Sequence, residues 1–204
     1  QETLPVTVPI PGRFTVYNAL GALACCYDLG IPLAKAIQAL EKVPPVKGRL
    51  EVVPVPAPYT VVIDYAHTPD ALEQVLADAR RVTQGRLICL FGCGGDRVKT
   101  KRPVMGEIAA CLSDLVILTS DNPRTEDPEA ILDQVAAGFP RGFADYHRDP
   151  DRRAAIALAL SLGRAGDVIL LAGKGHETYQ EIGKNRLPLD EREEIASFFQ
   201  KSKV

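Results

Sequence analysis

Four short stretches of the chain are almost entirely apolar, and a polar or glycine-rich segment follows each of them. They cover residues 60–65, 86–91, 115–120 and 167–172. Apolar runs of this length, without alternation, are typical of strands that are covered on both faces of a parallel sheet. Helical patterns lie between and after them, at 69–82, 104–112, 128–137, 151–162 and 190–200. The alternation predicts an open, doubly wound α/β sheet with helices on both faces.

The amino-terminal part of the chain follows another pattern. Residues 14–29 are apolar and rich in alanine, and a glycine that follows them is a helix stop signal. A second helix is expected after Pro32 and ends before a pair of prolines. Two helices of this length cannot enclose a core, so we expect residues 1–46 to belong to a larger unit. Residues 47–204 then form a second domain, which opens with a β-rich run at 50–55.

Composition narrows the classes of function. The 204 residues are 46% hydrophobic and 25% charged, which is ordinary for a soluble globular protein. The formal net charge of −2 gives no basic field, so nucleic acid is not expected as a partner. No apolar run approaches the roughly 20 residues of a membrane span, and the start QETLPVTVPI lacks the basic and apolar regions of a signal peptide. We expect a cytoplasmic, monomeric protein without a membrane partner.

The cysteines show neither a disulfide framework nor the spacing of a zinc site. There are five, an odd number, at Cys25, Cys26, Cys89, Cys93 and Cys111. Several lie in apolar segments. We expect buried or half-buried thiols in a reducing cytoplasm, without a metal or redox role.

Titratable and glycine-rich residues follow all four predicted strands. The segments are DYAHTPD (64–70), FGCGGDR (91–97), DNPR (121–124) and AGKGHETY (172–179). In doubly wound sheets, ligands bind beyond the carboxyl ends of the strands. Two of the three histidines of the chain lie in these loops. The sequence therefore predicts a ligand site at this edge of the sheet.

Parts of these loops have simpler interpretations. Thr68 and the proline after it can cap a helix, and residues 92–95 can form a tight turn. GCGGDR lacks the last glycine of a dinucleotide fingerprint, and GKGHE is not a phosphate loop. Lys174 by itself is more often a solvated charge than a ligand. Asp64 and His67 are harder to dismiss, because a helix start needs neither an acid nor an imidazole there.

The segment SDNPRTE (120–126) combines helix punctuation with residues that punctuation does not require. The DPE that follows it supplies a cap at Asp127, a first-turn proline and an acid favoured by the helix dipole. Asp121, Asn122 and Arg124 are left over. Arginine offers a planar fork for a carboxylate, and an acid beside it suits an ammonium group. The combination fits a zwitterionic amino acid better than a nucleotide.

At these residues the chain resembles the Mur ligases, the ATP-dependent amide-forming enzymes of peptidoglycan synthesis. The matching segments occur in the order of the family and span nearly the whole chain. They are GRFTVYNALGALA (12–24), KGRLE (47–51), DYAHTPDAL (64–72), FGCGGDR (91–97), KRPVMG (101–106), SDNPRTEDP (120–128) and GKGHETYQ (173–180). The DNPR motif is similar to that of the members that add meso-diaminopimelate to UDP-N-acetylmuramoyl-L-alanyl-D-glutamate.

The resemblance implies two sets of binding residues. Those implied for diaminopimelate are Arg97, Asp121, Asn122, Pro123, Arg124, Gly173 and Glu177. Those implied to lie near ATP are Asn18, Asp64, Tyr65 and His67. At position 15 the family often has an asparagine, whereas this chain has Thr15, which speaks against a nucleotide contact there.

The resemblance also implies that much of a ligase lies outside this sequence. Mur ligases have three domains, and the chain resembles the last helices of the central domain followed by the Rossmann-like C-terminal domain. The UDP-binding domain, the phosphate loop, the magnesium ligands and the carbamylated lysine have no counterpart here. We therefore expect the chain alone to bind the amino acid but not to be an active ligase, since it carries no catalytic or metal-binding residue. ATP and Mg²⁺ would act in the whole enzyme.

Three alternatives remain open from the sequence. The α/β pattern and the glycine-rich turns also suit a stand-alone nucleotide- or dinucleotide-binding module, although the glycine fingerprint is incomplete. A lysine-adding Mur ligase is a second alternative, against which DNPR counts. A non-enzymatic amino-acid-binding or interaction domain is the third.

Overall fold

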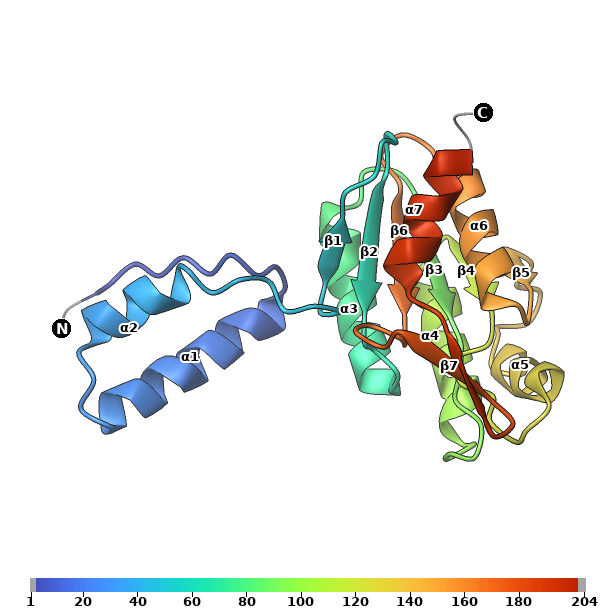
Figure 1. Cartoon of the computed structure of the whole chain (residues 1–204), viewed down its shortest axis with the longest axis horizontal. Coiled ribbons are helices and arrows are strands. Elements are labelled where there is room, and N and C mark those ends of the chain that lie inside the picture. The colour runs from blue at the N-terminus through green and yellow to red at the C-terminus, as the bar shows by residue number, and fades with distance from the viewer. Residues whose placement is uncertain (1–2, 202–204) are drawn as a thin grey trace.

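A six-stranded sheet forms the centre of the larger part of the protein (Figure 1). A computed structural model describes residues 3–201. The strands of this sheet, in spatial order, are β1 (Glu51–Val53), β2 (Thr60–Asp64), β6 (Val168–Ala172), β3 (Leu87–Phe91), β4 (Leu115–Leu118) and β5 (Tyr146–Arg148). The short hairpin of β7 (Tyr179–Ile182) and β8 (Asn185–Pro188) forms a second, two-stranded sheet.

The doubly wound α/β arrangement predicted from the apolar runs is confirmed. The four runs become β2, β6, β3 and β4, which are neighbours and parallel, as is β5 at the edge. Within this sheet, as the structure describes it for residues 3–201, β1 alone pairs antiparallel, with β2. The pairing of Asp64 with Ala172 and of Phe91 with Leu118 brings the carboxyl ends of the four strands to one edge. The loops that follow them therefore meet there.

Helices cover both faces of the sheet. One face packs against α3 (Pro69–Val82), α4 (Lys101–Leu112) and α5 (Pro128–Ala136). The other packs against α6 (Arg152–Leu162) and α7 (Glu191–Lys201). Every residue of β3 and β6 is buried, which explains why these strands show no alternation of polar and apolar residues.

The helix boundaries follow the capping signals. Thr68 accepts a hydrogen bond from the backbone of Ala71, with proline in the first turn of α3. Asp127 caps α5 in the same way, as expected from DPE. Helix α4 begins at Lys101, three residues earlier than expected, because Pro103 occupies its first turn and does not precede it.

Three strands were not predicted. All three residues of β5 are exposed, and so are those of β8, so neither carries an apolar run. In β7, polar residues prevail. Edge strands and small hairpins of this kind are stabilised by their pairing partners more than by burial, which a single sequence does not reveal.

Two helices precede the sheet, as predicted, and lie apart from it as a hairpin (Figure 1). They are α1 (Arg13–Asp28) and α2 (Leu33–Leu40), which pack through Leu23, Ala36 and Ile37. Large apolar side chains on the other sides of α1 are exposed, among them Tyr17 and Leu20. None of the helices within residues 3–201 is long and apolar enough to cross a membrane.

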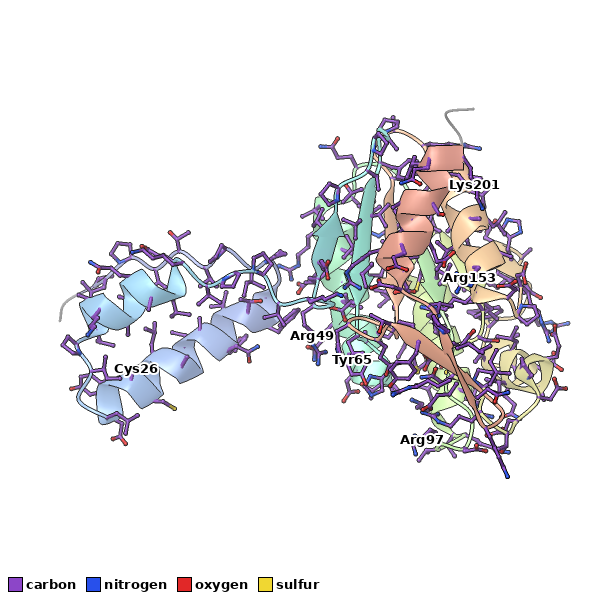
Figure 2. The ribbon with its side chains drawn as sticks, in the orientation of Figure 1. Cys26, Arg49, Tyr65, Arg97, Arg153 and Lys201 are labelled. Atoms are coloured by element: carbon purple, nitrogen blue, oxygen red, sulfur yellow. The ribbon has the colours of Figure 1, made fainter. Side chains whose placement is uncertain are left out.

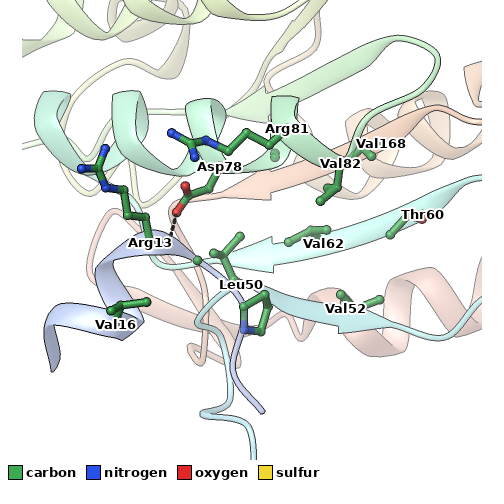
Figure 3. A pocket seen from close by; sticks show the side chains of 13 residues that line it. Arg13, Val16, Leu50, Val52, Thr60, Val62, Asp78, Arg81, Val82 and Val168 are labelled. Carbon is green, nitrogen blue, oxygen red and sulfur yellow. Dashed lines mark hydrogen bonds between the residues drawn. The ribbon is translucent and has the colours of Figure 1, made fainter. Parts of the chain in front are cut away.

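The start of α1 rests on the sheet domain beside an apolar cavity of about 360 Å³ (Figure 3). The backbone N–H of Arg13 donates to Asp78 of α3 over 2.9 Å. Val62 and Val168 line the cavity from the sheet, and Leu50 lines it from the segment before β1. It lies on the α3 face, away from the loops at the carboxyl edge.

The cysteines fit the expectation only in part. All five are free thiols. Cys89 and Cys93 are buried and Cys26 is half-buried, but Cys25 and Cys111 are exposed, contrary to the prediction. Burial raises the pKa of both Cys89 and Cys93 to about 12, so these thiols stay protonated near neutral pH.

Candidate functional site

A cavity of about 380 Å³ opens at the carboxyl edge of the sheet, where the four loops meet. Eight of the eleven residues implied by the resemblance line it: Tyr65, His67, Arg97, Asp121, Asn122, Arg124, Gly173 and Glu177. Gly173 is the first residue after β6 and has φ +113°, a backbone conformation that favours glycine. Three of the implied residues, Asn18, Asp64 and Pro123, do not line this cavity.

Asn122 is held by three hydrogen bonds. Its Oδ1 accepts from Lys174 Nζ over 2.6 Å and from the backbone N–H of Glu181 over 2.9 Å. Its Nδ2 donates to Glu177 Oε2 over 3.1 Å. These partners come from the loop after β6 and from β7. The buried amide therefore joins three separate parts of the chain and has one orientation.

Arg124 is fixed by the β7–β8 hairpin. It has φ +52°, which is rare for a residue with a side chain, and its backbone bonds to Glu181 and Gly183 on both sides. Its Nε donates to Glu181 Oε2 over 2.9 Å, and its Nη1 donates to the carbonyl of Gly95 over 2.8 Å. Within residues 3–201, Nη2 has no hydrogen-bond partner. One edge of the guanidinium thus remains available to a ligand in the cavity.

Lys174 is not the solvated charge that its sequence context suggested. Its side chain is fully buried. In addition to Asn122, its ammonium donates to Glu177 Oε2 over 2.9 Å and lies 3.5 Å from Asp121 Oδ1. A buried ammonium is costly unless it is paired, and here two carboxylates surround it. The correction follows from the tertiary fold, which closes both of these acids over the lysine.

The two carboxylates of the site differ in how far they are satisfied. Burial acts to raise the pKa of Glu177, but hydrogen bonds from Lys174, Asn122 and Tyr65 outweigh it and hold the pKa below its ordinary value. Glu177 is therefore ionised at neutral pH. Asp121 is buried, and its Oδ1 has no hydrogen-bond partner in the described part of the chain. Such an acceptor suits an ammonium group.

Arg102 and Glu126 link the glycine-rich loop that carries Arg97 to the DNPR loop. Arg102 is fully buried and donates to both carboxylate oxygens of Glu126 over 2.9 Å. It also donates to the carbonyl of Gly94, while Glu126 accepts from the backbone of Asp96. The Arg102 guanidinium lowers the pKa of Glu126 to about 2. Arg97 itself is exposed at the cavity and has no ion pair among residues 3–201.

Asp64 holds two backbone segments together and does not line the cavity. It is buried and accepts backbone hydrogen bonds from Leu50 and Ala66, over 2.7 and 2.8 Å. Burial raises its pKa against the effect of these two bonds. Asp64 therefore ties the linker before β1 to the loop after β2.

Tyr65 is surrounded by three polar rings or cations. Its ring lies 4.7 Å from His67 and 4.9 Å from His176, between ring centroids. Arg49 stacks on it, with its guanidinium carbon 4.9 Å from the ring centroid, at the junction of the helical hairpin and the sheet (Figure 2). Neither Arg49 nor His176 was predicted from the sequence as a site residue, although both lie in segments that match the family, KGRLE and GKGHETYQ.

Asn18 belongs to a different cavity, of about 480 Å³, beside α1. Arg49 lines this cavity too, together with apolar residues of both helices and of the linker. Thr15, which departs from the family pattern, is buried and donates to the carbonyl of Pro11 over 2.9 Å. Arg49 thus connects the surroundings of Asn18 with the cluster around Tyr65.

A family model described as Mur ligase, glutamate ligase domain, matches residues 48–175. The chain belongs to the Mur ligase family. It is 49% identical over 188 residues to the UDP-N-acetylmuramoyl-L-alanyl-D-glutamate--2,6-diaminopimelate ligase of Clostridioides difficile. The aligned residues make up 92% of this chain and 39% of that relative. The enzyme of the same name from Synechococcus elongatus is 50% identical over 191 residues, 93% of this chain and 38% of that relative.

Solved structures agree with the assignment of this chain to the Mur ligase family. A structure of a UDP-N-acetylmuramoyl-L-alanyl-D-glutamate--2,6-diaminopimelate ligase superposes with a TM-score of 0.75 at 40% identity, over 98% of this chain and 41% of that one. A pseudomurein peptide ligase from Methanothermus fervidus, at 20% identity and a TM-score of 0.69, shares the fold. The chain spans about two fifths of the length of the curated relatives it matches.

Proposed function

We propose that this chain supplies the amino-acid-binding part of an ATP-dependent ligase that adds meso-diaminopimelate to UDP-N-acetylmuramoyl-L-alanyl-D-glutamate in the cytoplasm. The observation that carries the proposal is the presence of open cationic and anionic groups in one cavity. Arg97 and the free edge of Arg124 can bind carboxylates. Asp121 and Glu177 can bind an ammonium group. The 49–50% identical relatives carry the name of this activity.

The proposed cavity distinguishes diaminopimelate from lysine by its second carboxylate. Lysine would leave one arginine without a partner in a partly enclosed site. An unpaired polar group of this kind costs binding free energy, so a site built to pair a substrate group rejects the analogue that lacks it. In this proposal Asn122 does not select the ligand directly. It holds Glu177 and the β7–β8 hairpin in place.

The reaction itself requires a nucleophilic amine and an activated carboxyl group. In the proposed enzyme, the γ-carboxylate of the D-glutamate residue would take the γ-phosphoryl group of ATP, with ADP as the leaving group. The free amine of diaminopimelate would then attack the acyl carbon and lose a proton while phosphate leaves. The residues of this chain would hold the far end of the amino acid so that its other amine points toward that carbonyl. Within residues 3–201, no group of three or more histidines, cysteines or acids is placed so that it could hold a metal ion.

We further propose that α1 and α2 belong to the nucleotide-binding domain of the whole enzyme. Their exposed apolar side chains, such as Tyr17 and Leu20, support a packing partner for this hairpin. Asn18 and Arg49 line one cavity, and Arg49 stacks on Tyr65. This arrangement would bring ATP against Tyr65 and His67, at the mouth of the amino-acid cavity. Movement about the linker at 44–48 would then close the two parts over both substrates.

Calorimetric titration of the chain with meso-diaminopimelate, L-lysine and ATP tests the proposal. We expect meso-diaminopimelate to bind and L-lysine to bind at least about tenfold more weakly, and we expect Arg124→Ala to abolish the selective binding. Arg81→Ala is the matched control, because Arg81 lies on α3 beside the apolar cavity of about 360 Å³, away from the proposed site. Equal affinity for the two amino acids would refute the assigned selectivity. If the chain binds ATP but neither amino acid, the alternative of a nucleotide-binding module is favoured instead.

A further inference from the structure

Lys174 occupies the centre of the proposed site without facing the ligand. Its side chain has no solvent exposure, while the residues around it line the cavity. Its ammonium reaches Asn122, Glu177 and Asp121 over 2.6, 2.9 and 3.5 Å. The ring of Tyr179 lies on a further side, with its centroid 5.3 Å from Nζ. Every polar partner of this buried cation is thus a residue that we assign to amino-acid binding.

Some carboxylate oxygens around Lys174 already accept hydrogen bonds, whereas others remain available to a ligand. Glu177 Oε2 accepts from both Lys174 and Asn122, whereas Oε1 has only the long 3.4 Å contact with the hydroxyl of Tyr65. Asp121 Oδ1 has no hydrogen bond and faces the ammonium from 3.5 Å. Two acids and one lysine leave the cluster with one net negative charge. One ligand ammonium balances that charge.

We propose that Lys174 is a positioning residue that orients Glu177 and Asn122 and sets the charge of the ammonium subsite to match a single ligand amine. This inference rests on the proposed function. Without the lysine, Asp121 and Glu177 would lie side by side as two partly buried acids. They would repel each other and would attract cations of higher charge. Lys174 therefore contributes to the preference for a zwitterion over a net cationic amino acid such as lysine.

The same geometry predicts a change in titration. Lys174 and Tyr65 contact the Glu177 carboxylate directly, and Asp121 lies on the same Lys174 ammonium. The other charged or titratable residues that line the cavity are His67, Arg97, Lys101 and Arg124. The hydrogen bond from Lys174 is the largest influence that lowers the pKa of Glu177, and burial opposes it. When the lysine is removed, burial and Asp121 should raise that pKa. Glu177 would then take up a proton as the pH falls from neutral.

Lys174→Gln tests the inference, with Lys174→Arg as the variant that retains the charge. Lys184→Gln, in the exposed turn between β7 and β8, is the matched control. We expect Lys174→Gln to weaken meso-diaminopimelate binding at least about tenfold, to narrow the preference over L-lysine and to make affinity fall as pH drops from 8 to 5.5. Wild type, Lys174→Arg and the control should show no such pH dependence in this range.

A ligand-free measurement separates this inference from the proposed function. NMR titration of the Glu177 side-chain carboxyl should show a higher pKa in Lys174→Gln than in wild type. Urea unfolding checks that the variant folds, and if it does not, Lys174→Met, which removes the charge but keeps the apolar stem of the side chain, provides the same comparison. An unchanged Glu177 titration and an unchanged amino-acid preference would overturn the role of Lys174. Failure of the wild-type chain to bind meso-diaminopimelate would overturn the proposed function, and the ligand preference with it.

Discussion

Arg102 binds both carboxylate oxygens of Glu126, and this pair joins the two loops that carry the arginines of the proposed site. Arg102 lies on α4 and reaches the glycine-rich loop through the carbonyl of Gly94. Glu126 follows the DNPR segment and accepts the backbone N–H of Asp96. A planar guanidinium that makes two parallel bonds fixes direction as well as distance. The positions of Arg97 and Arg124 therefore depend on a pair that lies outside the cavity.

Replacing Arg102 by methionine should lower both stability and affinity. The change leaves the half-buried Glu126 without its main partner, which is expected to cost about 1.5–3 kcal/mol of unfolding free energy. Urea unfolding measures this cost, and titration with meso-diaminopimelate measures the effect on the site. Lys99→Met is the control, since Lys99 contacts the same acid from an exposed position and should cost no more than about 1 kcal/mol. Equal effects of the two changes would contradict the assignment.

The Arg102–Glu126 pair should also give the fold a specific dependence on pH. Because the pKa of Glu126 is lowered from 4.5 to about 2 in the folded chain, the pair contributes its full stabilisation above pH 4.5. That contribution is lost as the pH falls from about 4.5 to about 2. We expect the difference in unfolding free energy between wild type and Glu126→Gln to shrink over this range. A difference that stays constant down to pH 2 would show that Glu126 titrates normally.

Close approach of two backbones explains one glycine of the site. A Cβ at Gly95 would lie 1.9 Å from the carbonyl oxygen of Pro123, so Gly95→Ala must displace the DNPR loop. We expect a loss of about 1–3 kcal/mol in stability and weaker binding of meso-diaminopimelate. Gly21→Ala provides the contrast, because nothing lies within 4 Å of its Cβ in α1 and alanine favours a helix by up to about 1 kcal/mol. Thermal unfolding and calorimetry of both variants test the difference.

A second ion pair supports the carboxyl edge from the other face of the sheet. Arg152 and Glu191 are both fully buried, and Arg152 also donates to the carbonyl of Ser120, just after β4, and to that of Ala172 at the end of β6. Arg152→Met should cost about 3–5 kcal/mol, because it leaves a buried acid unpaired. The double change Arg152→Met with Glu191→Leu should recover a large part of that loss.

Urea unfolding of the single and double variants decides this prediction. Arg80→Ala, which breaks an exposed pair with Asp114, serves as a control and should cost about 1 kcal/mol or less. A double variant as unstable as the single one would mean that the bonds from Arg152 to the two strand ends, not the unpaired acid, account for the loss.

Much of the fold could be predicted from local signals. Apolar runs without alternation identified the four central strands, because strands buried on both faces need no polar side. Thr68 and Asp127 marked two helix starts, because a cap acts within its own turn. The same reasoning placed the polar loops at one edge, since parallel strands all end on the same side. The β7–β8 hairpin was missed because its strands are held by each other and by the DNPR loop, and neither contact is local.

The features of the site also divide into those that local sequence predicts and those that it does not. The sequence alone determined which residue types gather at the carboxyl edge, and Asp121, Asn122, Arg124 and Glu177 do meet there. Only the tertiary structure decided that Asp64 is a backbone tie and that Lys174 is a buried partner of two acids. Burial and pairing of a charge depend on segments far apart in the chain, and local sequence does not encode their distance. Capping and strand burial, by contrast, depend on neighbours in sequence, which is why these were predictable.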